Sequence, residues 1–186
     1  MGRGIVVLML LAWALSARAE APPGAPDQEG GSPAIRGLTP REVEDLREGH
    51  GMGLARAAEL NGYPGPRHLL DAARAGRLHL APDQQAAVER LFADMAAEAR
   101  RLGARVLEEE QGLEAALRAG TVDDADLAAR LGRLAALQAE LRRVHLRTHL
   151  RTRALLSAHQ VERYNALRGH ASGVSAPGGA PPSPHH

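Results

Sequence analysis

The chain has 186 residues and no cysteine, its aromatic content is 2%, and its 23 basic residues nearly balance its 22 acidic residues. The lack of cysteine excludes disulfide bonds and thiolate metal ligands, so packing alone must stabilise the fold. The shortage of aromatic side chains argues against nucleic-acid stacking surfaces and aromatic-lined cofactor pockets, and we expect no nucleic-acid partner.

Residues 1–19 have the pattern of a secretory signal peptide. Arg3 precedes an apolar run over residues 5–15, and the small residues at 17–19 form an A-x-A cleavage site. The apolar run is too short to span a bilayer, which takes roughly 20 apolar residues. We therefore expect cleavage before Glu20, export from the cytoplasm, and a mature protein that does not span the membrane.

Composition divides the rest of the chain into one domain and two tails. Residues 20–37 and 171–186 are rich in Pro, Gly, Ala and Ser, which predicts a disordered linker and a disordered tail. Residues 38–170 have the size of one domain, and Ala, Leu, Arg and Glu dominate them while β-branched and aromatic residues are scarce. This composition predicts an all-α domain.

The first predicted helix runs from Pro40 to Glu48. Thr39 is its expected N-cap, Glu42 is the capping-box partner, and Gly49 ends it. This stretch therefore contains both the capping residues that start a helix and the glycine that ends it.

Turn residues organise the next segment. GHGMG at 49–53 predicts a loop, LARAAEL at 54–60 a further helical turn, and NGYPGP at 61–66 a sharp break. The stretch 66–75 predicts a helix of about two turns that Gly76 closes.

Two long helices are predicted next. The first begins at LAPDQ, where Ala81 stands in the position of a capping Thr or Ser, and it continues for about 36 residues to Gly120. At 1.5 Å per residue such a helix is about 50 Å long. Its apolar stripe consists of Leu91, Met95, Leu102, Val106, Leu113 and Leu117.

The second long helix is expected to start at a capping box formed by Thr121 and Asp124. Its stripe of leucines continues in phase through His145 and His149, and Ser157 then caps a last short helix. The pair predicts a long antiparallel helical hairpin with short flanking helices. Because two helices cannot cover both of their own faces, we also expect a homodimer.

Two helix starts share one spacing, LAPDQ at residue 80 and LSAHQ at residue 156. The shared positions are Leu80 with Gln84 and Leu156 with Gln160. This pair resembles the paired LTxxQ motif of the Spy/CpxP family of bacterial periplasmic proteins, from which it departs at Ala81. The resemblance covers about residues 38–170, including GMGLARAAELNGYPGP and YNALRG.

The Spy/CpxP resemblance implies a periplasmic location and a thin, curved four-helix subunit that forms an antiparallel dimer with a cradle-shaped face. The family includes ATP-independent chaperones, envelope-stress modulators and heavy-metal-resistance sensors. The sequence itself contains no nucleophile motif, phosphate loop or paired-carboxylate arrangement, so we expect a protein that acts by binding and not an enzyme.

A basic stretch in the second long helix is the candidate client-binding surface. It consists of Arg142, Arg143, Arg147 and Arg151. One interpretation is a solvated face that balances acidic residues near the end where the two long helices are joined. The other is a cationic, partly apolar cradle for unfolded proteins, since arginine stems cover apolar surface while their charged groups stay hydrated.

The two in-phase histidines also predict a metal site. If the chain reverses between residues 121 and 122, Glu98 lies opposite His145, and Met95 lies near His149. Two imidazoles and a carboxylate suit Zn, Ni, Co or Cu. The alternative is a buried polar network that fixes the register of the two helices.

The GHGMG loop could complete this metal site. His50 and Met52 are further candidate ligands if the loop folds back onto the long helices. Metal-sensing members of the resembled family also use histidines and a glutamate. We therefore expect either a periplasmic chaperone that needs no cofactor, which is the leading hypothesis, or a metal-binding sensor or resistance accessory with a membrane signalling partner.

Overall fold

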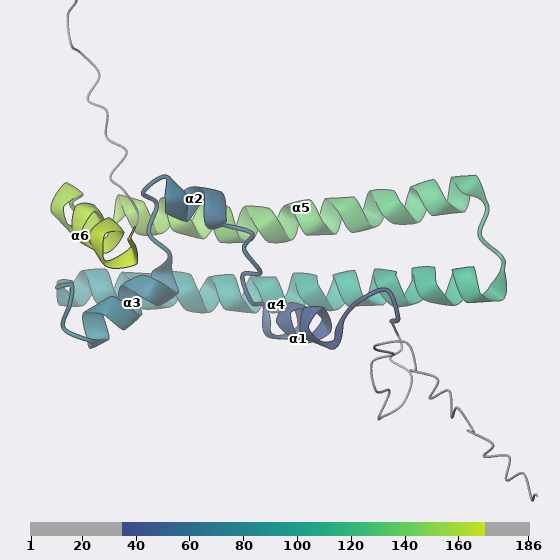
Figure 1. Cartoon of the computed structure of the whole chain (residues 1–186), viewed down its shortest axis with the longest axis horizontal. Coiled ribbons are helices and arrows are strands. Elements are labelled where there is room, and N and C mark those ends of the chain that lie inside the picture. Colours follow the sequence, from purple (N-terminus) through teal and green to yellow (C-terminus); the bar gives the residue numbers. More distant parts are fainter. Residues whose placement is uncertain (1–34, 170–186) are drawn as a thin grey trace, which may run out of the picture. The chain divides into compact units, whose positions relative to one another are not determined.

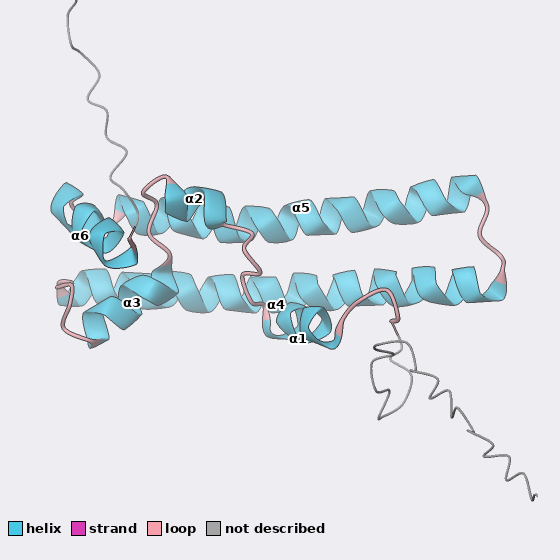
Figure 2. Ribbon diagram, viewed as in Figure 1, coloured by secondary structure: helices cyan, strands magenta, loops and turns pink. Residues whose placement is uncertain are grey.

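The computed structural model describes residues 35–169, and this part of the chain contains six α-helices and no strand (Figures 1 and 2). The prediction of an all-helical domain is therefore confirmed. The helices are α1 (Pro40–Glu48), α2 (Arg56–Leu60), α3 (Pro66–Arg74), α4 (Pro82–Ala119), α5 (Asp124–Ala154) and α6 (Ala158–Arg168). The predicted signal peptide, nearly all of the linker and the C-terminal tail lie outside the described residues.

Within residues 35–169, no helix combines the length and the apolar character that crossing a membrane requires.

Local capping chemistry sets the ends of several helices as predicted. At α1, the Glu42 N–H donates to Thr39 Oγ1 over 3.2 Å, and Glu42 Oε2 accepts from the Thr39 N–H over 2.8 Å. Gly49 follows α1 with a φ of 69°, in the left-handed region that glycine adopts without strain. The predicted boundaries of α1 are therefore confirmed.

The start of α5 differs from the prediction. Asp123 is the N-cap, and its Oδ1 accepts from the Asp126 N–H over 2.8 Å. Thr121 instead donates its hydroxyl to the carbonyl oxygen of Ala116 over 3.3 Å, at the end of α4. The predicted Thr121–Asp124 capping box is thus wrong, because the chain needs residues 120–123 to reverse direction before the first free N–H groups of α5 appear.

Helices α4 and α5 pack along each other in opposite directions, and the short helices pack on them (Figure 1). Helix α1 lies on α4, α2 lies on α5, and α3 contacts both. A central core joins α1, α4 and α5; it consists of Ile35, Leu46, Ala99, Leu102, Val106, Leu107, Leu134, Leu137, Leu141 and Val144. An end core joins α3, the start of α4, and α6; it consists of Leu69, Leu70, Ala72, Leu78, Leu80, Val88 and Tyr164.

The contact between α1 and α4 depends on a glycine. A β-carbon on Gly103 would lie 2.8 Å from the carbonyl carbon of Leu46, and closer still to its oxygen. The backbones therefore touch at this point, which only glycine permits. This contact fixes the position of α1 and, through it, the loop that follows.

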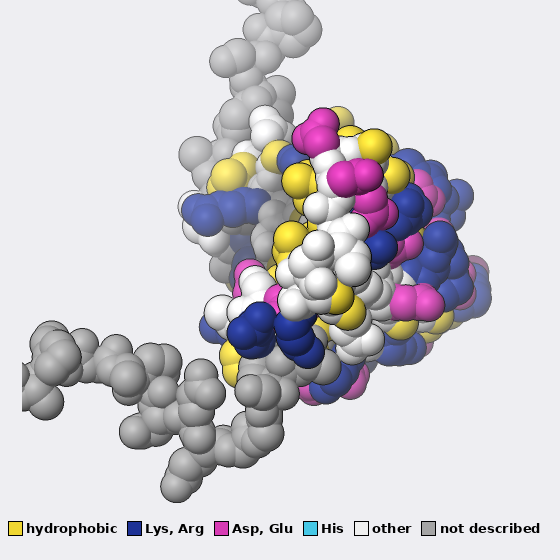
Figure 3. All heavy atoms as spheres, turned by 90° about the vertical axis from the view of Figure 1, so that its right-hand side faces the viewer, with side chains coloured by type: hydrophobic (Ala, Val, Ile, Leu, Met, Phe, Trp, Pro, Cys, Tyr) yellow, Lys and Arg dark blue, Asp and Glu magenta, His cyan; other side chains and the backbone are white. Residues whose placement is uncertain are grey.

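The end where α4 and α5 are joined lacks covering helices. Leu117 and Leu131 are 56% and 48% exposed there. Viewed from this end, basic and acidic side chains are interspersed with apolar ones (Figure 3). The ion pairs here include Arg118 with Glu114, Arg130 with Asp126, and Arg133 with Glu109. The charges at this end therefore partly neutralise each other.

Candidate functional site

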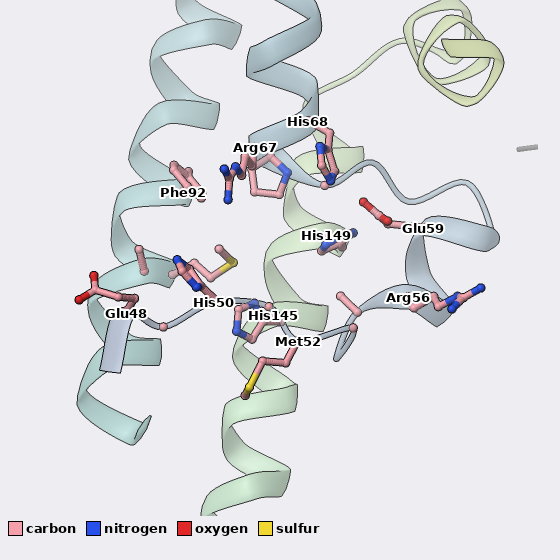
Figure 4. A pocket seen from close by; sticks show the side chains of 18 of the residues that line it. Glu48, His50, Met52, Arg56, Glu59, Arg67, His68, Phe92, His145 and His149 are labelled. Carbon is pink, nitrogen blue, oxygen red and sulfur yellow. The ribbon is translucent and has the colours of Figure 1, made fainter. Parts of the chain in front are cut away.

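A cavity of about 720 Å³ lies where the two cores meet. Phe92, which packs against the end core, and Met95, which packs against the central core, form its wall on α4. His145 and His149 line it from α5, and the loop after α1, α2, the start of α3 and the end of α6 line the remaining sides (Figure 4). Segments that are distant in the sequence thus enclose one space.

His145 is the most unusual residue of this pocket. The residue is only 3% exposed, and its Nε2 atom is buried without a hydrogen-bond partner among the described residues. Burial lowers the pKa of His145 below its ordinary value, and the neighbouring His149 lowers it further. The imidazole is therefore neutral at pH 7. Leaving such a buried group unpaired costs about 1–3 kcal/mol.

His149 is held in a defined tautomer. Its Nδ1 atom lies 2.9 Å from the carbonyl oxygen of Tyr63. A carbonyl can only accept, so in the neutral form of the ring Nδ1 carries the proton and Nε2 keeps the lone pair. Gly65 makes room for the ring, since a β-carbon there would lie 3.0 Å from His149 Cε1 and 3.4 Å from Nε2. A backbone carbonyl that orients an imidazole in this way is typical of metal-ligating histidines.

The loop after α1 brings two more candidate ligands to the pocket. His50 Nδ1 lies 2.9 Å from Asp45 Oδ1, a pairing that orients the ring and leaves its other nitrogen available. Met52 has a φ of 43° and is the only non-glycine residue with a positive φ within 35–169. Such strain costs on the order of 1–3 kcal/mol and is commonest at functional sites. Both residues line the pocket (Figure 4).

The structure does not bring Glu98 to the histidines. Glu98 Oε2 lies 2.7 Å from Arg147 Nη2, and Glu98 is not part of the pocket lining. The prediction that Glu98 joins His145 and His149 is therefore wrong. Arg147 follows His145 by two positions, which places Arg147 about 200° around α5 from His145, and Glu98 faces Arg147. Among the described residues, no three His, Asp or Glu side chains are close enough to share one metal ion. The other five candidates, His50, Met52, Met95, His145 and His149, line one pocket.

The four candidate client-binding arginines fall into two pairs. Arg143 is bound by Glu140 one turn earlier on α5, and this guanidinium lowers the pKa of Glu140. Arg147 is bound by Glu98 across the contact with α4. Arg142 and Arg151 are exposed and form no ion pair within residues 35–169. Only these last two offer unpaired positive charge on this surface.

The two motif glutamines contact each other, which the sequence did not indicate. Gln84 Nε2 donates to Gln160 Oε1 over 3.1 Å, and Gln160 Nε2 donates to Gln84 Oε1 over 2.9 Å. Each Oε1 also accepts from the N–H of its own N-cap residue, Ala81 or Ser157. Because Ala81 has no side-chain oxygen, α4 keeps only this half of its capping box. The pair joins the start of α4 to the start of α6.

Sequence reasoning missed the side of the pocket that α2, α3 and α6 provide. His68 lines the pocket, and burial lowers its pKa, followed in size by the effect of Arg168. Tyr164, buried in the end core, accepts from the Gly65 N–H over 3.1 Å and donates to Glu59 Oε1 over 3.3 Å. The NGYPGP break hid this side, because helical periodicity does not continue through it.

No protein-family model, characterised protein or solved structure matches the chain. The resemblance to the Spy/CpxP family therefore stays a prediction that rests on the two motifs and their spacing.

Proposed function

We propose that the protein binds a transition-metal ion in the pocket between α4, α5 and the loop at 49–53, and that it acts as a metal sensor or metal-resistance accessory in the periplasm, not as an enzyme. The observation that carries the proposal is the buried, unpartnered Nε2 of His145 beside His149, whose Nδ1 is already occupied by a carbonyl. A neutral imidazole without a protein partner is the form that donates a lone pair to a metal.

The donor set favours copper among the four metals that the sequence suggested. Because no three of the described His, Asp and Glu side chains are close enough to share one ion, the candidate donors are two of the imidazoles of His50, His145 and His149, together with the thioethers of Met52 and Met95. Thioethers are soft ligands that suit Cu(I), which favours copper. Zinc, nickel and cobalt remain the alternatives, because the carboxylates of Glu48 and Glu59 also line the pocket. A bound ion would connect the loop at 49–53 to α5 through its coordination bonds.

Calorimetric and thermal titrations test the metal proposal. The metal-free protein is titrated with Cu(I) under reducing conditions, and with Cu(II), Zn, Ni and Co. We expect one saturable Cu(I) site per chain, and a stabilisation of about 2.7 kcal/mol when free ligand is at 100 times Kd. His149→Ala should abolish both signals, whereas His159→Ala, at an exposed position outside the pocket, should preserve them.

Two further results separate this proposal from its competitors. Glu98→Gln should leave the affinity unchanged, because Glu98 binds Arg147 and not the pocket. Binding that survives the double change His145→Ala and His149→Ala, or the absence of a saturable site for every metal, would return the histidines to a polar network that fixes helix register.

An ATP-independent chaperone is the second candidate function, and exposed apolar surface on α5 favours it. Leu131 and Leu150 are 48% and 54% exposed on the helix that also carries the unpaired Arg142 and Arg151. Arginine stems and leucines together suit weak, promiscuous binding of unfolded chains. Purified protein should suppress aggregation of an unfolded client without ATP, and Arg142→Glu with Arg151→Glu should weaken this more than Arg90→Glu on α4.

Export and assembly belong to the same proposal. We propose that cleavage before Glu20 releases a subunit built on the α4–α5 hairpin, and that two subunits form an antiparallel homodimer. The exposed Leu117 and Leu131 support a partner surface at the joined end of the hairpin. Mass spectrometry of periplasmic material should find the chain starting at Glu20, and sedimentation should show a dimer at micromolar concentration.

A further inference from the structure

The pocket is much larger than a metal ion requires. Its volume of about 720 Å³ falls in the range of roughly 300–1,000 Å³ in which proteins bind small organic molecules. Its walls include apolar surface from Phe92 and Met95. The cavity therefore has room and a suitable wall for a carbon skeleton, in addition to the histidines on α5.

The charged residues around the pocket carry an excess of positive charge. Four arginines and two glutamates line it, which leaves an excess of two positive charges when the histidines are neutral. They are Arg56, Arg67, Arg100 and Arg168, with Glu48 and Glu59. A lining with this balance attracts anions, and enclosure between packed helices strengthens the attraction.

Few of these arginines are neutralised by protein groups. Glu59 is shared: its Oε2 lies 3.7 Å from Arg168 Nη2, and its Oε1 accepts from the Tyr164 hydroxyl. Arg67 and Arg100 form no ion pair within residues 35–169, although both line the pocket. Their guanidinium groups are therefore available to a ligand.

The environment of His68 shows that positive charge converges on one side of the pocket. After burial, Arg168 is the largest influence that lowers the pKa of His68, and Arg67 lowers it as well. Glu59 and Asp71 act in the opposite direction without cancelling the shift. Figure 4 shows Arg67 and His68 at the same side of the pocket, with Phe92 and His149 around it.

We infer that the pocket binds a small organic dianion, a dicarboxylate whose carbon chain lies on Phe92 and Met95 and whose carboxylates are held at Arg67 with Arg168 and at Arg100. Arg100 follows Phe92 by eight residues on α4, about 12 Å along the helix axis, so the two positively charged places lie at opposite ends of the apolar wall. A long dicarboxylate reaches both places, and a short one reaches a single place. The binding does not depend on a metal ion.

The experiment uses the full mature chain, freed of metal with a chelating resin because soluble chelators are themselves polycarboxylates. Calorimetry with azelate, succinate, octanoate and inorganic phosphate measures the affinity and the number of sites. We expect one azelate per chain, bound at least tenfold more tightly than succinate, which is too short, and than octanoate, which lacks the second carboxylate. Removing one charge-assisted hydrogen bond lowers an affinity by roughly tenfold or more.

Variants locate the site. Arg67→Gln and Arg100→Gln should each weaken azelate binding at least tenfold, whereas Arg90→Gln, at an exposed arginine of α4 outside the pocket, should have no effect. Bound azelate should also raise the pKa of His68 in an NMR titration, since a nearby carboxylate favours the protonated ring. Circular dichroism verifies that the variants are folded.

Three outcomes would overturn this inference. They are the absence of saturable binding by any dicarboxylate, tighter binding of phosphate than of azelate, and an equal loss of affinity in the Arg67→Gln and Arg90→Gln proteins. Tighter binding of phosphate would identify an inorganic oxyanion site. An equal loss of affinity in the two variants would mean that azelate is attracted only by the general positive charge of the protein. Because metal is absent throughout, none of these results bears on the proposed metal function.

Discussion

Replacing Gly103 with alanine tests how α1 is held on α4. Helix propensity alone favours the change, since alanine in a helix interior is about 1 kcal/mol better than glycine. The added methyl group, however, would lie 2.8 Å from the Leu46 carbonyl carbon and closer to its oxygen. Both of these Leu46 atoms belong to the backbone, so α1 has to move as a unit.

The expected magnitude follows from these opposing effects. Overpacking of this kind costs typically 1–3 kcal/mol, and a displaced α1 also uncovers part of the central core, which includes Leu46, Leu102 and Val106. We expect Gly103→Ala to lower the free energy of unfolding by roughly 1–3 kcal/mol despite its better propensity. Urea denaturation followed by circular dichroism measures this value directly.

Gly132 provides a matched control within the same fold. It lies inside α5, and a β-carbon there would meet nothing within 4 Å. Gly132→Ala should therefore raise the free energy of unfolding by about 0.5–1 kcal/mol. A Gly103→Ala protein that is as stable as the Gly132→Ala protein would refute the argument that α1 is held by backbone contact. The same displacement should weaken metal binding, because His50 and Met52 follow α1 directly.

Three other predictions concern single interactions. Burial lowers the pKa of His145 in the folded protein, so the stability contributed by its neutral imidazole is fully present above the unfolded-state pKa near 6.5 and is lost as the pH falls below that pKa. The melting temperature should therefore drop less between pH 7.5 and pH 5 in His145→Gln than in the native protein. Gln84→Ala should cost about 1–3 kcal/mol in urea denaturation, and adding Gln160→Ala should cost less than a second independent change of this kind, because the first change already leaves the other amide unpaired. Arg147→Gln should cost under about 1 kcal/mol, since the Arg147 and Glu98 side chains are 33% and 30% exposed and the pair is screened by solvent; a cost well above this range would contradict the argument.

Helix boundaries were predictable from the sequence where a single local contact sets them. The capping boxes at Thr39 and Ser157 each connect residues three positions apart, so the sequence contains both partners. At the turn between α4 and α5, Thr121 and Asp123 are both plausible N-caps by composition. The choice of Asp123 depends on how many residues the chain uses to reverse direction, which the composition does not specify.

The composition of the site was only partly predictable for a different reason. The spacing of His145 and His149 placed both on one face of α5, and both are buried there. Which α4 residues face these histidines depends on how α5 is rotated about its own axis, and successive residues of a helix differ by about 100° in direction. Glu98 consequently binds Arg147. The contribution of His68 depends on the path of the chain through NGYPGP, which periodicity does not describe.

The strongest reason to treat the pocket as functional is that the unpartnered Nε2 belongs to a residue that lines it, His145. Thr152 and Asn165 also contain a buried polar atom without a partner among the described residues. A threonine on a helix can turn its hydroxyl to the carbonyl four residues earlier, as Thr148 does with Val144 over 2.9 Å, and a half-turn of an amide exchanges its oxygen and nitrogen. A half-turn of the His145 ring exchanges its nitrogen and carbon atoms in the same way. His145, however, lines the pocket, whereas Thr152 and Asn165 do not, so a group that enters the pocket can satisfy its Nε2.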